Sequence, residues 1–164
     1  MRILGIDPGV GILGFGVIDA INSGKLKLID GGVIRTDSDK SDSDRLATIY
    51  DELHEIIKFQ KPQIMVVEKL FFSQNVTTAM SVSQARGVVL LCGKQHKLKL
   101  YEYTPLQIKQ ALTGYGHADK KQIQEMVRVI LGLKDVPKPD DCADALAAAI
   151  CHTMNSNRKI ENRN

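Results

Sequence analysis

The chain has 164 residues, 43% of them hydrophobic and 25% charged, and a formal net charge of +3. This length and composition predict an ordinary globular domain with its own core, and the mild positive charge permits a nucleic-acid partner without requiring one. No apolar run approaches the roughly 18 residues that a membrane span needs, so we expect neither a membrane anchor nor a signal peptide.

The cysteines at positions 92, 142 and 151 form no CxxC pair and show no spacing to histidine that would hold zinc. The sequence around each of them is apolar and helical in pattern. Free thiols in a reducing compartment are therefore favoured over a disulfide framework or a zinc site. The sequence thus predicts a cytoplasmic protein.

Hydrophobic periodicity predicts strands early in the chain and helices later. Strands at 2–7, 12–20 and 25–36, with a turn at 22–24, should form an antiparallel meander. The remaining elements expected are a helix after the loop at 37–43, with apolar positions from Leu46 to Ile57, strands at 64–68 and 99–103, and a helix at 75–94. Two further helices start at the capping boxes Thr104-Pro-Leu-Gln107 and Asp119-Lys-Lys-Gln122, and a last helix runs from Asp140 to Met154.

These elements predict a single α/β domain, residues 1–154, with about five strands. The segment at 155–164 is polar, and we expect it to be a disordered tail.

Asp7 ends the first apolar strand and is followed by Pro8-Gly-Val-Gly11. Glycines in such a turn let a bulky ligand approach the backbone closely. An aspartate that only caps the turn is the alternative. The same pattern also resembles the phosphate loop of actin-like sugar kinases and chaperone ATPases, but those need a second domain and a second phosphate loop, which 164 residues cannot supply.

Three further acids occupy positions where a site is expected. Glu68 ends an apolar strand, at the edge where sites form in open α/β sheets, although it could instead face solvent beside Lys69. Asp141 and Asp144 lie on one face of the first turn of the last helix, where aspartate is also common because of the helix dipole. The small apolar residues that follow should pack on the sheet and bring these acids to the edge that carries Asp7.

Converging carboxylates repel one another unless a cation lies between them. Hard oxygen ligands of this kind suit Mg²⁺ or Mn²⁺, ions that act on phosphate esters. The four acids together predict a metal-dependent phosphodiesterase. Phe71 and Phe72 lie just after Glu68, where an aromatic side chain could stack on a base, although core packing is the usual place for phenylalanine.

The chain resembles the RuvC-type Holliday-junction resolvases over residues 1–154. The resemblance rests on four segments that occur in order: Ile3-Leu-Gly-Ile-Asp-Pro-Gly9, Val66-Val-Glu-Lys-Leu-Phe-Phe72, Ser83-Gln-Ala-Arg-Gly87 and Asp141-Cys-Ala-Asp-Ala-Leu146. It implies a ribonuclease H-like fold, with a five-stranded mixed sheet flanked by helices, and an endonuclease that resolves four-way DNA junctions in recombination and DNA repair.

The resemblance also implies roles for individual residues. Asp7, Glu68, Asp141 and Asp144 correspond to the family's acidic quartet, which would hold two Mg²⁺ ions, with Mn²⁺ as a substitute. Phe71 matches an aromatic residue that reaches the junction, and Phe72 beside it is a second candidate. Lys109 and Lys120 match basic residues near the scissile strand, and Lys121 is an alternative to Lys120. For the lysines at 120 and 121, a solvated surface is the simpler explanation.

The partners that the resemblance implies are junction DNA, a second copy of the chain, and a branch-migration complex of the RuvA and RuvB type. The homodimer would nick two strands symmetrically and leave 5′-phosphate and 3′-hydroxyl ends. A different ribonuclease H-like nuclease, acting on RNA–DNA hybrid, and a non-catalytic junction-binding module remain as alternatives.

An independent argument for a dimer comes from the segment Val82–Cys92, which is apolar on nearly all sides of its expected helix. Such a helix must be covered on both sides. One side can meet the sheet, and Val88, Val89, Leu90 and Leu91 are expected to leave apolar surface for another chain. The alternative is that a neighbouring helix of the same chain covers this surface.

Overall fold

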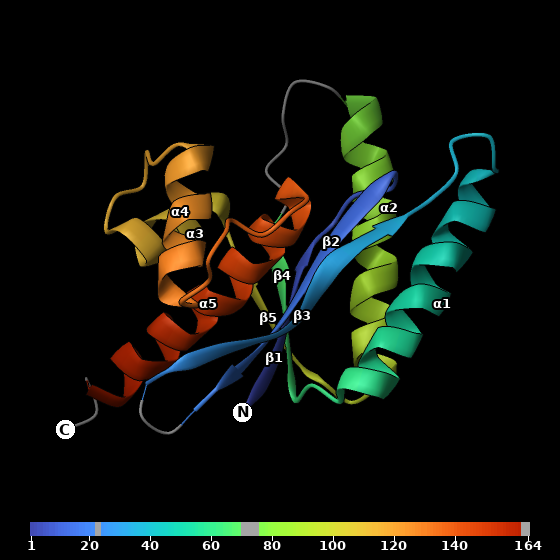
Figure 1. Cartoon of the computed structure of the whole chain (residues 1–164). Coiled ribbons are helices and arrows are strands. Elements are labelled where there is room, and N and C mark those ends of the chain that lie inside the picture. The colour runs from blue at the N-terminus through green and yellow to red at the C-terminus, as the bar shows by residue number, and fades with distance from the viewer. Residues whose placement is uncertain (22–23, 70–75, 162–164) are drawn as a thin grey trace.

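The computed structural model, which describes residues 1–21, 24–69 and 76–161, has one five-stranded sheet with the strand order β3-β2-β1-β4-β5 (Figure 1). The strands are β1 (Arg2–Asp7), β2 (Ile12–Ala20), β3 (Leu26–Arg35), β4 (Ile64–Glu68) and β5 (Lys99–Tyr103). The helices are α1 (Asp42–Gln60), α2 (Val76–Gln95), α3 (Pro105–Thr113), α4 (Lys120–Ile130) and α5 (Asp140–Glu161).

The sheet is mixed. β1, β2 and β3 pair antiparallel, whereas β4 runs parallel to β1 and β5 runs parallel to β4. The predicted meander and the predicted five-stranded mixed sheet are therefore confirmed. Because β1 and β4 are parallel neighbours, their carboxyl ends meet at one edge of the sheet.

Helices cover both faces of the sheet: α1 and α2 on one side, and α3, α4 and α5 on the other (Figure 1). Successive residues of a strand point to opposite faces. Thus Ile3 and Val66 pack in the core with α3, α4 and α5, whereas Leu4 and Val67 pack in the core with α1 and α2. Neither face of β1 or β4 is open to solvent, and this explains their continuous apolar runs.

Helix α5 lies unusually close to β1 and β2. A Cβ atom added to Gly5 would lie 2.0 Å from the carbonyl oxygen of Ala145, and one added to Gly14 would lie 2.0 Å from that of Asp141. The alanines of α5 present little side-chain volume, so the helix backbone can approach the glycines of the sheet. This contact fixes where the first turn of α5 lies relative to the end of β1.

The helix ends agree in part with the expectations. Both capping boxes are present, Thr104 with Gln107 and Asp119 with Gln122. α1 begins earlier than expected, at Asp42, because the Ser41 side chain accepts a hydrogen bond from the Asp44 N–H and caps it. α5 runs to Glu161 rather than ending at Met154, because neither Gly nor Pro interrupts the polar residues that follow.

Helix α2 only partly follows the expectation of a free apolar face. Val89 is fully buried against the sheet and α1, so it is not available to another chain, and naming it as interface was wrong. Leu91 is 55% exposed and Met80 is 63% exposed. With Gly87 these residues follow a spacing of seven and four positions, which places them on one side of the helix.

The cysteines lie in the described part of the chain, where they are buried and form no disulfide bond. Across the same described residues, no helix has the length and apolar character required to cross a membrane.

Gly5→Ala should lower the free energy of unfolding by about 1–3 kcal/mol, because the new methyl group forces α5 away from β1. Gly11→Ala is the matched control, since its Cβ would make only an ordinary 3.5 Å contact with Arg45. Urea denaturation of both variants measures the difference. Equal stability of the two variants would show that α5 is not held at the distance described.

Candidate active site

The register of β1 and β4 brings two predicted acids together. Ile6 pairs with Val67, so the next residues, Asp7 and Glu68, lie side by side at the sheet edge. Since side chains alternate along a strand, both acids point to the face that also carries Ile3 and Val66. That face is the one covered by α5.

Helix α5 supplies the other two acids from its first turns. Asp7 pairs with Gly14 across β1 and β2, and the Asp141 backbone rests on Gly14. Asp144 lines a pocket together with Asp7 and Glu68. Asp141 is not part of the pocket wall, but it lies near enough for its charge to raise the pKa of Asp7.

This pocket, called the acidic pocket below, has a volume of about 280 Å³. Its walls combine three carboxylates, two lysines and an apolar remainder: Asp7, Glu68, Asp144, Lys109, Lys120, Pro105, Ile108, Ile123 and Ala147. The side chains come from β1, β4, α3, α4 and α5, so the pocket exists only in the folded chain.

The lysines differ in position. Lys120 donates into the acidic pocket, with its Nζ 3.2 Å from Asp144 Oδ2 and 3.5 Å from Asp140 Oδ2. Lys109 lines the pocket from α3. Lys121 lies outside it and lines a separate groove on the other side of α4.

Asp140 was not singled out from the sequence, although it adjoins Asp141 and its charge acts on Lys120. The signal that could have identified it is the Asp140-Asp141 doublet at a helix start. The apolar walls, Pro105 and Ile108, follow a capping box and had no distinguishing signal of their own. Phe71 and Phe72 lie outside the described residues.

The acids destabilise one another's charged forms. Burial, and then the charges of Glu68, Asp144 and Asp141, raise the pKa of Asp7 from 3.8 to about 8. Burial and Asp144 raise the pKa of Glu68 to about 7, against an opposing effect of Lys109 and Lys120. Burial also raises the pKa of Asp144, which Lys120 opposes.

Lys120 responds in the opposite direction. Burial lowers its pKa, but Asp144 and Asp140 together raise the pKa by more, so the ammonium stays charged. One cation thus compensates part of the negative charge in the acidic pocket.

The donor set fits a divalent cation of the magnesium type. All the acidic groups offer hard oxygen ligands, and a cation among them would remove the repulsion that raises their pKa values. Among the described residues, however, no three carboxylate, imidazole or thiol side chains stand close enough together to hold a metal ion as they are placed.

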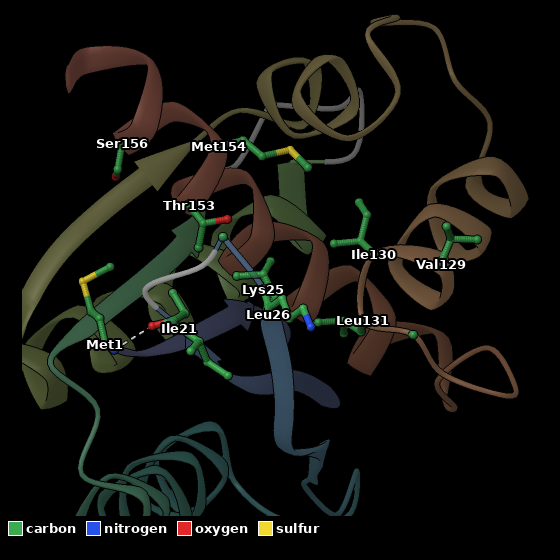
Figure 2. Close-up of a pocket in the computed structure, with 13 residues that line it drawn as sticks. Met1, Ile21, Lys25, Leu26, Val129, Ile130, Leu131, Thr153, Met154 and Ser156 are labelled. Atoms are coloured by element: carbon green, nitrogen blue, oxygen red, sulfur yellow. Dashed lines mark hydrogen bonds between the residues drawn. The ribbon is translucent and has the colours of Figure 1, made fainter. Parts of the chain in front are cut away.

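A larger pocket, about 820 Å³, lies between the end of β2, the start of β3 and the C-terminal parts of α4 and α5 (Figure 2). Its walls are mainly apolar, with Ile21, Leu26, Val129 and Met154 among them, and Lys25 is the one charged side chain among its described lining residues. No carboxylate side chain is among the described residues that line it, whereas three line the smaller acidic pocket.

Comparisons with known proteins agree on one family. Residues 3–152 match the family model described as crossover junction endodeoxyribonuclease RuvC. A protein of that name from Caldicellulosiruptor saccharolyticus is 52% identical over 156 residues, which cover 95% of this chain and 94% of the relative.

Two solved structures are similar over nearly the whole chain. Thermus thermophilus RuvC has a TM-score of 0.90 at 37% identity, covering 97% of each chain. T. thermophilus RuvC in complex with a Holliday junction substrate has a TM-score of 0.88 at 34% identity, covering 96% of each chain. The predicted ribonuclease H-like fold is confirmed by this likeness.

Asp7→Asn should raise the melting temperature of the metal-free protein at pH 8 and change it little near pH 4. The pKa of Asp7 is about 8 in the folded chain and 3.8 ordinarily. A group with a raised folded pKa contributes stability that is full below its ordinary pKa and is lost as the pH rises through the folded pKa. Calorimetric scans from about pH 4 to pH 8 test this window.

Asp19→Asn is the control of opposite sign. Hydrogen bonds from Arg2, 2.8 and 2.9 Å long, lower the pKa of Asp19. Its stabilisation is present above the ordinary pKa and is lost as the pH falls through the lowered one. Asp19→Asn should therefore lower the melting temperature at pH 8. Shifts of the same sign for both variants at pH 8 would contradict the assignment of a repulsive acidic pocket.

Proposed function

The chain belongs to the RuvC family of crossover junction endodeoxyribonucleases, and on that premise we propose that it hydrolyses phosphodiester bonds at four-way DNA junctions. The observation that carries the proposal is the acidic pocket, in which Asp7, Glu68 and Asp144 share walls with two lysines. A junction-binding module without catalysis would have no use for partly buried acids that repel phosphate. The acids also argue against any role limited to holding DNA.

The four acids, Asp7, Glu68, Asp141 and Asp144, would hold two Mg²⁺ ions. Bound there, the ions would generate a hydroxide nucleophile from water and stabilise the leaving 3′ oxygen. Mn²⁺ should substitute, because it accepts the same ligands.

The lysines have separate tasks in this proposal. Lys109 reaches the acidic pocket from α3 and would stabilise negative charge that builds on the scissile phosphate. Lys120 keeps the acidic residues of α5 oriented through Asp144 and Asp140, and its ammonium would also pair with the scissile phosphate when DNA binds. Phe71 and Phe72 remain candidates for the aromatic side chain that enters the junction.

A homodimer completes the proposal. The side of α2 that carries Met80, Gly87 and Leu91 is exposed, and a Cβ at Gly87 would meet no atom within 4 Å. Exposed apolar residues beside a glycine allow two helices to approach closely. A two-fold dimer suits a substrate with two-fold symmetry, since each subunit meets an equivalent strand.

The wider setting follows from the proposed reaction. Symmetric nicks that leave 5′-phosphate and 3′-hydroxyl ends can be sealed by a ligase, as recombination and DNA repair require. We place the protein in the cytoplasm, in keeping with cysteines that form no disulfide. Branch-migration proteins of the RuvA and RuvB type would be its partners at the junction.

Asp7→Asn should reduce junction cleavage by about 100-fold or more, because it removes a charged metal ligand. Junction binding should be unchanged or tighter, because the substitution removes negative charge near phosphate. Nicking assays with Mg²⁺, Mn²⁺ and Ca²⁺ on a four-way junction, a linear duplex and an RNA–DNA hybrid measure both effects. Ca²⁺ should support binding without cleavage.

Asp44→Asn, an exposed acid at the start of α1, serves as the matched control and should cut like the wild type. Wild-type cleavage by Asp7→Asn would refute the proposed catalysis. If the protein cuts the RNA–DNA hybrid in preference to the junction, its activity is instead that of a hybrid-specific nuclease.

Leu91→Glu should give a folded monomer, because an unpaired charge in an apolar interface is costly. Val129→Glu on α4 is the control, since Val129 is exposed to the same 55% and lies on the opposite face of the sheet. Sedimentation reports the oligomeric state, and a junction assay reports whether paired incision is lost. A Leu91→Glu variant that stays dimeric and fully active would place the interface elsewhere.

A further inference from the structure

A second groove lies on the other side of α4 from the acidic pocket, with a volume of about 550 Å³. The first turns of α4 separate the two hollows, since Lys120 and Ile123 line the acidic pocket whereas Lys121 and Gln122 line the groove. The groove, called the α4 groove below, is lined by Leu112, Thr113, Tyr115, Ala118, Asp119, Lys121, Gln122, Glu125 and Met126.

Tyr115 is the most distinctive residue of the α4 groove. It is 58% exposed, and its ring meets the exposed ring of His117 edge-on, with centroids 5.6 Å apart and an angle of 63° between the planes. An exposed aromatic pair contributes little to the core of its own protein. Such rings offer a flat surface on which another planar group can stack.

The turn that carries Tyr115 is held in place by the chain itself. The Thr113 hydroxyl accepts a hydrogen bond from the Tyr115 N–H at 3.1 Å. Gly114 ends α3 with a positive φ of 72°, and Leu106 fills the space beside Gly116. Tyr115 therefore lies on an ordered backbone, and it loses little conformational entropy when a ligand binds.

Lys121 is the one cation among the described residues that line the groove, and the two carboxylates there both have partners. Asp119 already accepts the Gln122 N–H at 2.8 Å as the cap of α4. Glu125 is bonded to Arg128. Both acids are thus engaged, whereas Lys121 lines the groove together with the apolar side chains of Leu112 and Met126.

We propose that the α4 groove is a nucleotide subsite that receives an unpaired base of the junction, stacked on Tyr115, with the adjoining phosphate at Lys121. The proposal rests on the proposed function, which supplies DNA as the substrate class. The base must be unpaired because the faces of bases inside a duplex are covered by their neighbours. Strands that part at a branch point can expose such a face within reach of a groove beside the cleavage site.

The test compares binding of a synthetic four-way junction and a linear duplex of the same sequence, without divalent cations so that neither is cut. Tyr115→Ala should weaken junction binding about 5- to 150-fold, the range of one base–aromatic stack, and leave duplex binding unchanged. Tyr115→Phe keeps the ring and should bind within about twofold of the wild type. Phe59 on α1 has an 83% exposed ring and serves as the control, so Phe59→Ala should also bind the junction within about twofold of the wild type.

Two further readouts separate stacking from a structural role. A 2-aminopurine placed at the branch point should be quenched by the wild type and by Tyr115→Phe but not by Tyr115→Ala, with melting temperatures equal in all three. Lys121→Met should lower the slope of log affinity against log salt by about 0.7–0.9, the contribution of one phosphate contact.

Several results would overturn the α4 groove as a nucleotide subsite. The proposal fails if Tyr115→Ala binds the junction as tightly as the wild type, and this result would leave the groove to a protein partner. It also fails if Tyr115→Ala loses junction binding and duplex binding equally. If Tyr115→Ala melts early, Tyr115→Leu decides, because normal junction binding by a stable leucine variant excludes stacking. A wild-type protein that neither binds nor cuts junctions would instead refute the proposed function itself.

Discussion

The close contact of α5 with the sheet is the constraint on which the rest of the structure depends. Gly5 and Gly14 leave room for the backbone of α5 where any larger residue would collide with it. The alanines of α5, all in its N-terminal half, complete the contact from the other side, and every one of them is buried. Because the backbone of α5 lies directly on these strands, its first turns stay beside the ends of β1 and β4, and acids from distant parts of the chain share one pocket.

That packing has an electrostatic cost. Carboxylates gathered at a partly buried sheet edge raise one another's pKa, and Lys109 and Lys120 offset only part of the repulsion. The site is thus poised to gain from a divalent cation, since the same charges that destabilise the metal-free pocket would stabilise the ion. The carboxylates thus lower the stability of the metal-free protein at the edge where they serve function. The large apolar cores on both faces of the sheet offset this electrostatic cost.

The surfaces around the acidic pocket divide by element. Helix α4 separates the acidic pocket from the α4 groove, so neighbouring lysines serve different surfaces. The exposed side of α2 lies across the sheet from both, where a second subunit would not obstruct DNA at the acidic pocket. This division lets one small domain combine catalysis, substrate contact and proposed self-association without overlap.

Much of the fold was decided locally and could be read from the sequence. Asp7 and Glu68 each follow an apolar run, and a charged residue after such a run marks where a buried strand ends. Thr104 and Asp119 begin helices because their side chains satisfy backbone N–H groups three residues later. The antiparallel meander follows from turn chemistry and alternation over neighbouring segments. These features depend on short-range geometry, which the order of residues already contains.

Tertiary structure alone decided the rest, because burial and direction depend on elements far apart in the chain. Lys120 and Lys121 are equivalent in sequence, but the position of α5 turns one toward Asp144 and leaves the other to the α4 groove. Val89 and Leu91 are both apolar residues of α2, yet the sheet and α1 bury one and leave the other exposed. Which acids meet, and which apolar residues remain free for a partner, was determined by packing rather than by residue type.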